Sequence, residues 1–236
     1  MADPVLEVEA LRAGYGPAEI LFGVSLKLAR GEVAALMGRN GAGKSTTLKA
    51  IMGLLPPRAG QVRFAGQEIA GMPAFRIARL GLGYVPEDRR IFTDLTVAEN
   101  LEVGRRAARG HAAWTPERLF EIFPNLAAMR GRRAAAMSGG EQQMLAIART
   151  LMGNPDAVLL DEPSEGLAPV ILELMAEAVL SMKREGIAVL LSEQNFDFAA
   201  AVADRAYVIE RGEIRYDGSM AALEADPALR AQHLTL

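Results

Sequence analysis

The chain has 236 residues, of which 50% are hydrophobic, with a formal net charge of −3 and no cysteine. This composition supports one large core, needs no disulfide, excludes thiolate metal sites and argues against general nucleic-acid binding. The only two histidines, His111 and His233, lie far apart, so we expect no histidine-based metal cluster. The acidic start lacks a signal-type apolar region and no apolar run approaches the ~18 residues that span a bilayer, so we expect a cytoplasmic protein.

Hydrophobic periodicity predicts the secondary structure in chain order. Residues 33–37, 157–160 and 188–191 are nearly continuous apolar runs, typical of parallel strands covered by helices on both faces. The N-terminal segments alternate with polar residues and glycines, which predicts a mostly antiparallel layer beside the central sheet. A helical tail is expected over 219–236. The full set of predicted strands is 6–10, 24–28, 33–37, 62–64, 82–85, 157–160, 188–191, 205–209 and 213–216.

The middle of the chain reads differently from its two ends. From 97 to 152 the apolar spacing is helical, in Arg- and Ala-rich segments separated by glycines and prolines. We therefore predict a single domain over 1–236, in which a helical lobe, 87–156, is inserted between the two parts of a core, 1–86 and 157–236.

A glycine-rich loop follows the strand predicted at 33–37. Residues 38–46 read Gly-Arg-Asn-Gly-Ala-Gly-Lys-Ser-Thr, and a helical pattern over 44–52 follows. In a P-loop, backbone N–H groups hold phosphate oxygens, the lysine (Lys44) reaches the β- and γ-phosphates and the serine (Ser45) binds Mg²⁺. A tight turn without a ligand is the alternative, but it does not account for Lys44 and Ser45 in register. The other candidate phosphate-binding residues are Gly38, Asn40, Gly41, Gly43 and Thr46.

Two acidic residues end the buried strand predicted at 157–160. An unpaired carboxylate there is costly unless a cation or water receives it, and Mg²⁺ bound with the nucleotide supplies that cation. We assign Asp161 to the Mg²⁺ shell through water and Glu162 to general-base activation of the attacking water, a role worth about 10² to 10⁴ in rate. A strand-end turn with two solvated acids is the alternative.

A second anion-binding helix start is predicted at residues 138–143, which read Ser-Gly-Gly-Glu-Gln-Gln. A periodic apolar helix follows and stops at Gly153. Because this start belongs to the helical lobe, one nucleotide cannot easily use both cradles on the same subunit. The alternative is an ordinary N-cap serine with a capping glutamate.

These motifs together resemble the signature of ATP-binding-cassette (ABC) ATPases, and the resemblance covers essentially the whole chain. It implies an α/β fold: a RecA-like P-loop NTPase core with a parallel sheet, an N-terminal antiparallel β layer and an inserted helical lobe. It also implies ATP hydrolysis by a head-to-tail dimer with a second ABC ATPase subunit, either a different chain or a second copy. Tyr15 lies where the family's adenine-stacking aromatic usually sits, with a plain β-turn tyrosine as the alternative. The residues expected to meet the partner's ATP are Ser138, Gly139 and Gly140.

Three positions depart from the wider family. Glu87 stands where a glutamine is usual, Gln194 where a histidine is usual, and Ala168 where an aspartate is usual. We count Glu87 among the candidate metal ligands and Gln194, which can form hydrogen bonds to a γ-phosphate, among the candidate catalytic residues. With the segments V-P-E-x-R-R and E-Q-N, these residues resemble one branch, the ATP-binding subunits of branched-chain amino acid importers and of related urea and amide importers. Glu87 as an exposed loop acid and Gln194 as a neighbour of a helix cap are the alternatives.

The resemblance implies an ATP-hydrolysing importer subunit, peripheral on the inner face of the cell membrane. It would dock under membrane permeases through a groove near 87–94, and a substrate-binding protein would be an indirect partner, because this chain would not contact the cargo. Arg89 and Arg90 in that loop are either a solvated pair or a contact with the permease. The alternative functions are a soluble ABC ATPase acting on a macromolecular complex, and a P-loop kinase or GTPase, which the 138–143 signature opposes.

Overall fold

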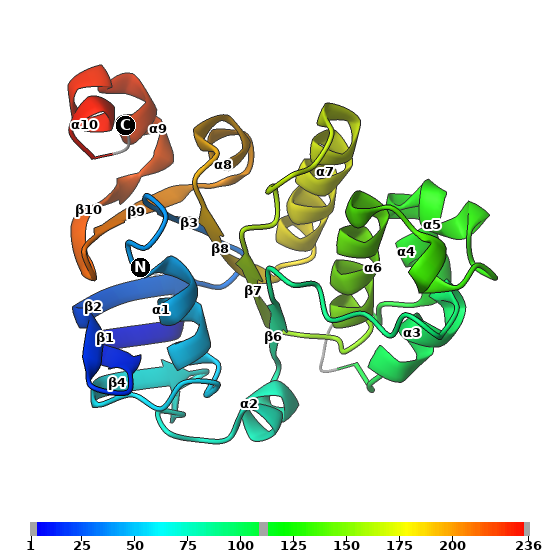
Figure 1. Cartoon of the computed structure of the whole chain (residues 1–236), viewed down its shortest axis with the longest axis horizontal. Helices are drawn as coiled ribbons and strands as arrows, with labels where there is room; N and C mark the ends of the chain where they lie inside the picture. The colour runs from blue at the N-terminus through cyan, green and yellow to red at the C-terminus, as the bar shows by residue number, and fades with distance from the viewer. Residues whose placement is uncertain (1–3, 109–112, 234–236) are drawn as a thin grey trace.

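The computed structural model describes residues 4–108 and 113–233, and within them the strands form two sheets (Figure 1). His111 and the last three residues of the predicted tail lie outside the described residues. The strands are β1 Pro4–Tyr15, β2 Ala18–Ala29, β3 Val33–Met37, β4 Ala59–Phe64, β5 Gln67–Glu68, β6 Leu82–Val85, β7 Ala157–Asp161, β8 Ala188–Glu193, β9 Arg205–Glu210 and β10 Glu213–Ser219. The helices are α1 Lys44–Ile51, α2 Ala74–Leu80, α3 Val97–Gly104, α4 Pro116–Ile122, α5 Pro124–Ala128, α6 Gly139–Leu151, α7 Pro169–Arg184, α8 Phe196–Val202, α9 Met220–Ala225 and α10 Pro227–His233.

The central sheet has the order β10-β9-β3-β8-β7-β6 and is parallel except for the β9–β10 pair. This arrangement confirms the prediction for the apolar segments: every residue of β3, β7 and β8 is buried. The bounds of β3 and β6 are those predicted, whereas β7 and β8 continue through Asp161 and Glu193. The extra residues are polar, so hydrophobicity alone ended these strands too early.

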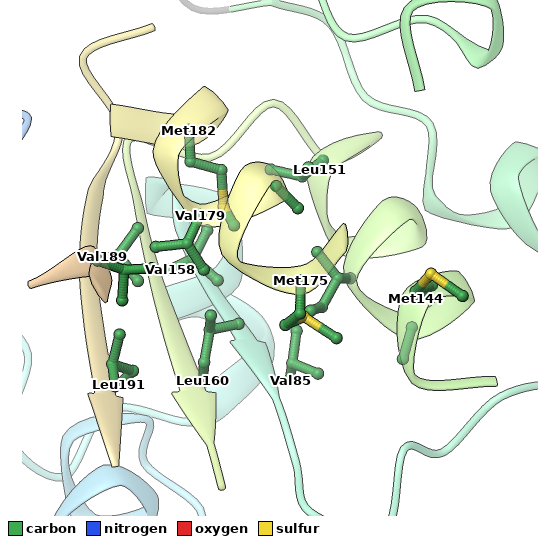
Figure 2. Packing of buried hydrophobic residues seen from close by; sticks show 14 of the residues in the cluster. Val85, Met144, Leu151, Val158, Leu160, Met175, Val179, Met182, Val189 and Leu191 are labelled. Carbon is green, nitrogen blue, oxygen red and sulfur yellow. The ribbon is translucent and has the colours of Figure 1, made fainter. Parts of the chain in front are cut away.

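Alternate residues of the central strands enter two different cores, because successive side chains of a strand point to opposite faces. Val158 and Leu160 of β7 pack in one cluster with α6, α7 and α8, and Figure 2 shows Val158 against Val179 of α7. Leu159 lies on the other face with α1 and the N-terminal β layer. Burying each such Val or Leu side chain contributes about 1.5–3 kcal/mol.

The N-terminal layer is antiparallel, as predicted, with the order β2-β1-β4-β5. The predicted strands at 6–10 and 24–28 were too short, since β1 and β2 each have 12 residues. Register shifts interrupt the β1–β2 pairing between Val8 and Leu11, and Ala10 has a φ of 47°. A bulge of this kind breaks the two-residue alternation, which is the signal by which a strand is recognised in sequence.

Helices α3, α4, α5 and α6 lie together at one end of the molecule (Figure 1). Their apolar side chains belong to the same hydrophobic cluster as Val158 and Leu160 of the sheet. Leu101, Leu119 and Leu145 are among them. The prediction of a helical segment here is thus correct, while the division of the chain at 87 and 156 stays a prediction. Helix α2 was not predicted; only Ile77 of this helix is buried, so it carries little periodic signal.

Candidate functional site

Three neighbouring parallel strands bring the predicted residues to one edge of the central sheet. The order β3-β8-β7 places β8 between the other two, and all three strands run in the same direction. The glycine-rich loop follows β3, Gln194 follows β8, and Glu162 follows β7. Parallel strands end at the same edge of a sheet, where α/β proteins bind ligands. Segments more than 100 residues apart in sequence therefore meet here.

The amino end of α1 is open to an anion. Its N-cap residue, Gly43, has a φ of 114° and no side-chain hydrogen bond caps the helix, whose first turn contains no acid. A Cβ on Gly43 would lie 2.9 Å from Leu21, and one on Gly38 would lie 2.5 Å from the carbonyl oxygen of Ile209. Only glycine fits these two positions. The loop therefore keeps its backbone N–H groups and the positive end of the helix dipole available to a phosphate.

Lys44 lies at the centre of this loop. Its side chain is only 3% exposed, and Nζ donates to the carbonyl oxygens of Gly38 at 2.9 Å and Arg39 at 3.2 Å. Nζ also lies 3.0 Å from Oε1 of Glu162. The ammonium group is thus aimed across the loop toward the end of β7, where a bound β/γ-phosphate would meet both residues.

Glu162 has a constrained backbone. Its φ of 47° lies in the left-handed region, which costs a non-glycine residue about 1–3 kcal/mol. The Glu162 N–H donates to the carbonyl oxygen of Ser192 at 3.1 Å, which holds this conformation against β8. Because strain of this kind persists only where neighbouring groups enforce it, the position of the Glu162 carboxylate is a built feature of the site.

Gln194 connects the glycine-rich loop to Glu162. Its Nε2 donates to Oδ1 of Asn40 at 2.6 Å and to Oε2 of Glu162 at 3.3 Å. Gln194 is also the residue before Asn195, the N-cap of α8, so the alternative that it neighbours a helix cap is correct as well. The two descriptions are compatible, because capping uses Asn195 and leaves the Gln194 amide free to reach Asn40 and Glu162.

A cavity of about 400 Å³ surrounds the Lys44 side of the loop. Sequence reasoning missed two of its lining residues, Ile20 and Glu165. Glu165 lies in the turn just after Glu162, and its pKa is raised by burial and then by the charges of Glu162 and Glu87. Its place three residues after a predicted catalytic acid was the available signal. The predicted residues that line the cavity are Tyr15, Asn40, Gly41, Gly43, Lys44, Ser45, Thr46, Glu87 and Glu162.

Asp161 lies beside this cavity and does not line it. The residue is 1% exposed, and its carboxylate accepts hydrogen bonds from the Tyr84 hydroxyl at 3.0 Å and from Oγ of Ser192 at 2.8 Å. Burial, followed by the Asp161 charge, raises the pKa of Tyr84, so the phenol keeps its proton and donates. Asp161 and Glu87 both line a neighbouring cavity of about 260 Å³. Contact of Asp161 with a metal through water fits this position better than direct ligation.

The oxygen donors fit Mg²⁺ only if it is shared with a nucleotide. No group of three or more His, Cys, Asp or Glu side chains in residues 4–108 and 113–233 could hold a metal by itself. The cavity does supply the Ser45 hydroxyl and the Glu87 carboxylate. Mg²⁺ is usually bound by one or two protein oxygens together with substrate phosphates, and Ser45 and Glu87 would supply the protein oxygens of such a set.

The amino end of α6 lies elsewhere. Ser138 and Glu141 form a capping box, in which the Ser138 N–H donates to Oε2 of Glu141 at 2.6 Å and Oγ of Ser138 accepts from the Glu141 N–H at 3.4 Å. The capping alternative is therefore correct as a description of the single chain. A Cβ on Gly139 would meet the Arg89 guanidinium at 2.8 Å, and none of residues 138–140 lines the Lys44 cavity.

Comparison with known proteins agrees with this geometry. Residues 21–165 match the ABC transporter family. The chain belongs to this family. It is 42% identical over 231 residues to the high-affinity branched-chain amino acid transport ATP-binding protein BraG of Pseudomonas aeruginosa, covering 98% of this chain and 99% of that one. It is 31% identical over 234 residues to the lipopolysaccharide export system ATP-binding protein LptB of Haemophilus influenzae, covering 98% and 97%.

The fold of this ABC protein matches solved structures equally well. A nucleotide-free ATP-binding cassette from an ABC transporter superposes with a TM-score of 0.81 at 28% identity, covering 96% of this chain and 97% of that one. The protein is thus an ABC transporter ATP-binding subunit and an ATP hydrolase with the predicted α/β P-loop fold. None of its described helices is both long and apolar enough to cross a membrane.

Proposed function

We propose that this ABC ATPase powers an importer of branched-chain amino acids. The observation that carries the proposal is the match to BraG along the whole chain, together with the Glu87 and Gln194 departures that first indicated this branch. The subunit would act on the inner face of the cell membrane beneath permease subunits, with a substrate-binding protein delivering the cargo outside. The chain itself would contact ATP and the permease, and the cargo would pass elsewhere.

In the proposed reaction, the glycine-rich loop and Lys44 bind the β- and γ-phosphates and Tyr15 stacks on adenine. Glu162 accepts a proton from the attacking water, and the Gln194 amide aligns that water and the γ-phosphate from its position against Asn40 and Glu162. Mg²⁺, when bound, would offset charge on the phosphate oxygens, with Ser45 and Glu87 as ligands and Asp161 acting through water. The Lys44–Glu162 ion pair would open on ATP binding, which frees Glu162 as a base.

The proposal includes a head-to-tail dimer, with either a second copy or a different ABC subunit. It is supported by the separation of the two phosphate-binding ends, since residues 138–140 do not line the Lys44 cavity of their own chain. Gly139 and Gly140 begin α6, so their backbone N–H groups are helix-start donors that a γ-phosphate from another subunit can use.

A groove suited to a permease helix lies between the sheet and the helical segment. It forms a cavity of about 430 Å³, and Leu54, Phe92 and Val103 at its edge are each about half exposed, which is unusual for large apolar side chains on a surface without a partner. Nη1 of Arg149 is buried there and has no hydrogen-bond partner in the described structure. The proposed occupant is a short permease helix with an apolar face and an acceptor for Arg149. Among the described residues that line the groove, none is acidic and three are arginines: Arg90, Arg106 and Arg149.

Cross-linking tests this docking, because the chain has no native cysteine. Phe92→Cys, co-expressed with the permease subunits, is expected to cross-link to them, and Phe22→Cys on the β layer is the matched exposed control. Labelling of the permease from both positions, or from neither, contradicts docking in the groove.

Transport in liposomes tests the function. The complex of this chain with its co-purified membrane subunits and binding protein is expected to accumulate radiolabelled leucine when ATP is supplied on the side of this subunit, and Glu162→Gln is expected to abolish uptake. If the liposomes accumulate none of leucine, isoleucine and valine, the proposal that branched-chain amino acids are the substrate is wrong.

Export is the second candidate, and the 31% identity to LptB favours it. The same liposomes distinguish import from export, because an exporter would move preloaded cargo away from the side on which ATP is supplied. If no membrane subunit co-purifies with the native chain, the result favours the alternative of a soluble ABC ATPase.

A further inference from the structure

The last residue of β8, Glu193, is a buried acid that the proposed reaction does not use. It is 2% exposed, and its carboxylate accepts four hydrogen bonds. Oε1 accepts from the Ser164 N–H at 2.9 Å, while Oε2 accepts from Oγ of Ser164 at 2.8 Å, the Gln194 N–H at 3.1 Å and the Asn195 N–H at 3.2 Å. The acid therefore joins the turn after β7 to the first residues after β8.

Burial raises the pKa of Glu193, while its hydrogen bonds to Ser164, Asn195 and Gln194 act in the opposite direction. A carboxylate in this position is tolerable only while its donors stay in place, since a buried charge without partners is costly. The four donors come from two loops, so the two loops are coupled: neither can move away without leaving Glu193 unsatisfied.

The same two loops carry the reactive groups of the site. Ser164 lies two residues after Glu162, and Gln194 directly follows Glu193. The preceding residue of β8, Ser192, makes a parallel connection, because its Oγ accepts from the Glu162 N–H at 3.1 Å and donates to Asp161 at 2.8 Å. Two consecutive residues at the end of β8 thus hold the segment that ends β7: Ser192 bonds to Asp161 and Glu162, and Glu193 bonds to Ser164. A cavity of about 320 Å³ that opens between these loops is lined by Glu162, Ser164, Glu193 and Gln194, among others.

We infer that Glu193 is a positioning residue for ATP hydrolysis, which sets the distance between the Glu162 carboxylate and the Gln194 amide by fixing both of their loops. The inference rests on the roles proposed for Glu162 and Gln194 and is independent of what is transported. Because Glu193 contacts neither the glycine-rich loop nor Lys44 in the described hydrogen bonds, its loss should slow the reaction and leave ATP binding intact.

The test uses ATP hydrolysis by the purified full-length chain, in the form in which it is isolated from cells. Glu193→Gln keeps the size of the side chain and replaces one acceptor oxygen by an NH₂ donor. This donor would face the N–H and O–H groups that now donate to Glu193, so those hydrogen bonds would be lost. The expected result is a kcat lower by about tenfold with a KM for ATP within about twofold of the wild type, since small misplacements of reacting groups cost about that much or more. Glu173→Gln, an exposed acid on α7, is the matched control and is expected to keep the wild-type kcat.

A double-mutant cycle separates positioning from general damage. Ser164→Ala removes one donor to Glu193 and is expected to lower kcat about threefold. Because both changes act through the same connection, the double variant should be no slower than Glu193→Gln alone, whereas independent effects would multiply. Should Glu193→Gln not fold, the cycle of Ser164→Ala with Gln194→Ala serves instead, with the same non-additive result expected.

Three outcomes overturn the inference. A wild-type kcat for Glu193→Gln removes Glu193 from the reaction, and multiplied losses in either cycle show that Ser164 does not act through it. Glu162→Gln, measured beside them, distinguishes the failures: if it loses hydrolysis while Glu193→Gln does not, only the positioning role fails. If Glu162→Gln hydrolyses ATP like the wild type, the assigned base and the positioning role fail together.

Discussion

The chain contains two helix starts that sequence analysis identified as phosphate-binding, and the structure shows that they are built differently. At α1 no side chain caps the helix, its first turn has no acid, and its first residue, Lys44, is buried. At α6, the N–H groups of Ser138 and Glu141 already donate to the side chains of this capping box, and Glu141 places a carboxylate in the first turn. An anion is therefore favoured at α1 in the single chain, whereas at α6 it must compete with a resident acid.

The difference suggests how a single chain avoids binding ATP at the wrong end. The α1 start has its own counter-charges and cavity, so it can bind nucleotide first. The α6 start lies outside that cavity, and in the proposed dimer it would be used only when another subunit presents a phosphate already held elsewhere. Variants at the two ends should accordingly affect different steps.

The largest expected effect is on hydrolysis at the α1 end. Glu162→Gln should slow ATP turnover about 10² to 10⁴-fold, because the proposed general base is lost. ATP should remain bound, so a dimer closed over it should accumulate and be visible by sizing chromatography with ATP. Adding Ser138→Arg at the α6 end should abolish that dimer. A monomer in all conditions would show that the chain does not pair with itself and needs a different subunit.

Binding should be lost when the α1 end is damaged directly. Lys44→Ala removes a cation from the β/γ-phosphates, and hydrogen bonds to charged groups are worth about 1.5–3 kcal/mol, so ATP affinity should fall up to about 100-fold. Titration calorimetry measures this, with Lys27→Ala on the exposed side of β2 as the matched control. Unchanged affinity in Lys44→Ala would remove this residue from the site.

A change at Gln194 should affect the reaction but not the binding at α1. Gln194→Ala should lower the ATPase rate by roughly 10 to 100-fold with nearly unchanged ATP affinity, since one hydrogen bond to a charged phosphate is lost mainly in the closed state. Gln194→His should retain activity and gain a rate inflection near its ordinary pKa of about 6.5, which the wild type lacks at this position. Rates of the three proteins from pH 5.5 to 8.5 decide this, and equal rates for wild type and Gln194→Ala mean that the γ-phosphate is sensed elsewhere.

The smallest effect concerns the cap of α6, and a second capping box in the chain provides its control. Thr96 and Glu99 at the start of α3 make the same contacts as Ser138 and Glu141. Ser138→Ala and Thr96→Ala should each lower the free energy of unfolding by about 1 kcal/mol in urea titrations. Only Ser138→Ala should also weaken the ATP-dependent dimer of the Glu162→Gln protein. Equal weakening by both would reduce Ser138 to a structural cap.

Local sequence signals predicted the central sheet well because the signal is strong in its strands. β3 and β6 have the predicted bounds, since Glu32 and Gly38 flank the first strand and Gly81 and Pro86 flank the second. The signal was weaker where the structure is irregular: the bulges in β1 hid seven of its 12 residues from the alternation pattern. Ile20 was missed because its residue type implies no chemistry, and Glu165 because its only signal, a place three residues after Glu162, does not show that the fold brings it to the cavity.

The sequence by itself determined the family, the ATP-hydrolysing chemistry and most of the lining of the Lys44 cavity, because a P-loop, a strand-end acid pair and a signature helix are local patterns. The tertiary structure alone decided how these patterns meet. The order β3-β8-β7 places Gln194 between Asn40 and Glu162, and it places Glu193 where four donors from two loops converge. Such contacts depend on the order of strands in the sheet, which pairs residues far apart in the chain and leaves no periodic signal in the sequence.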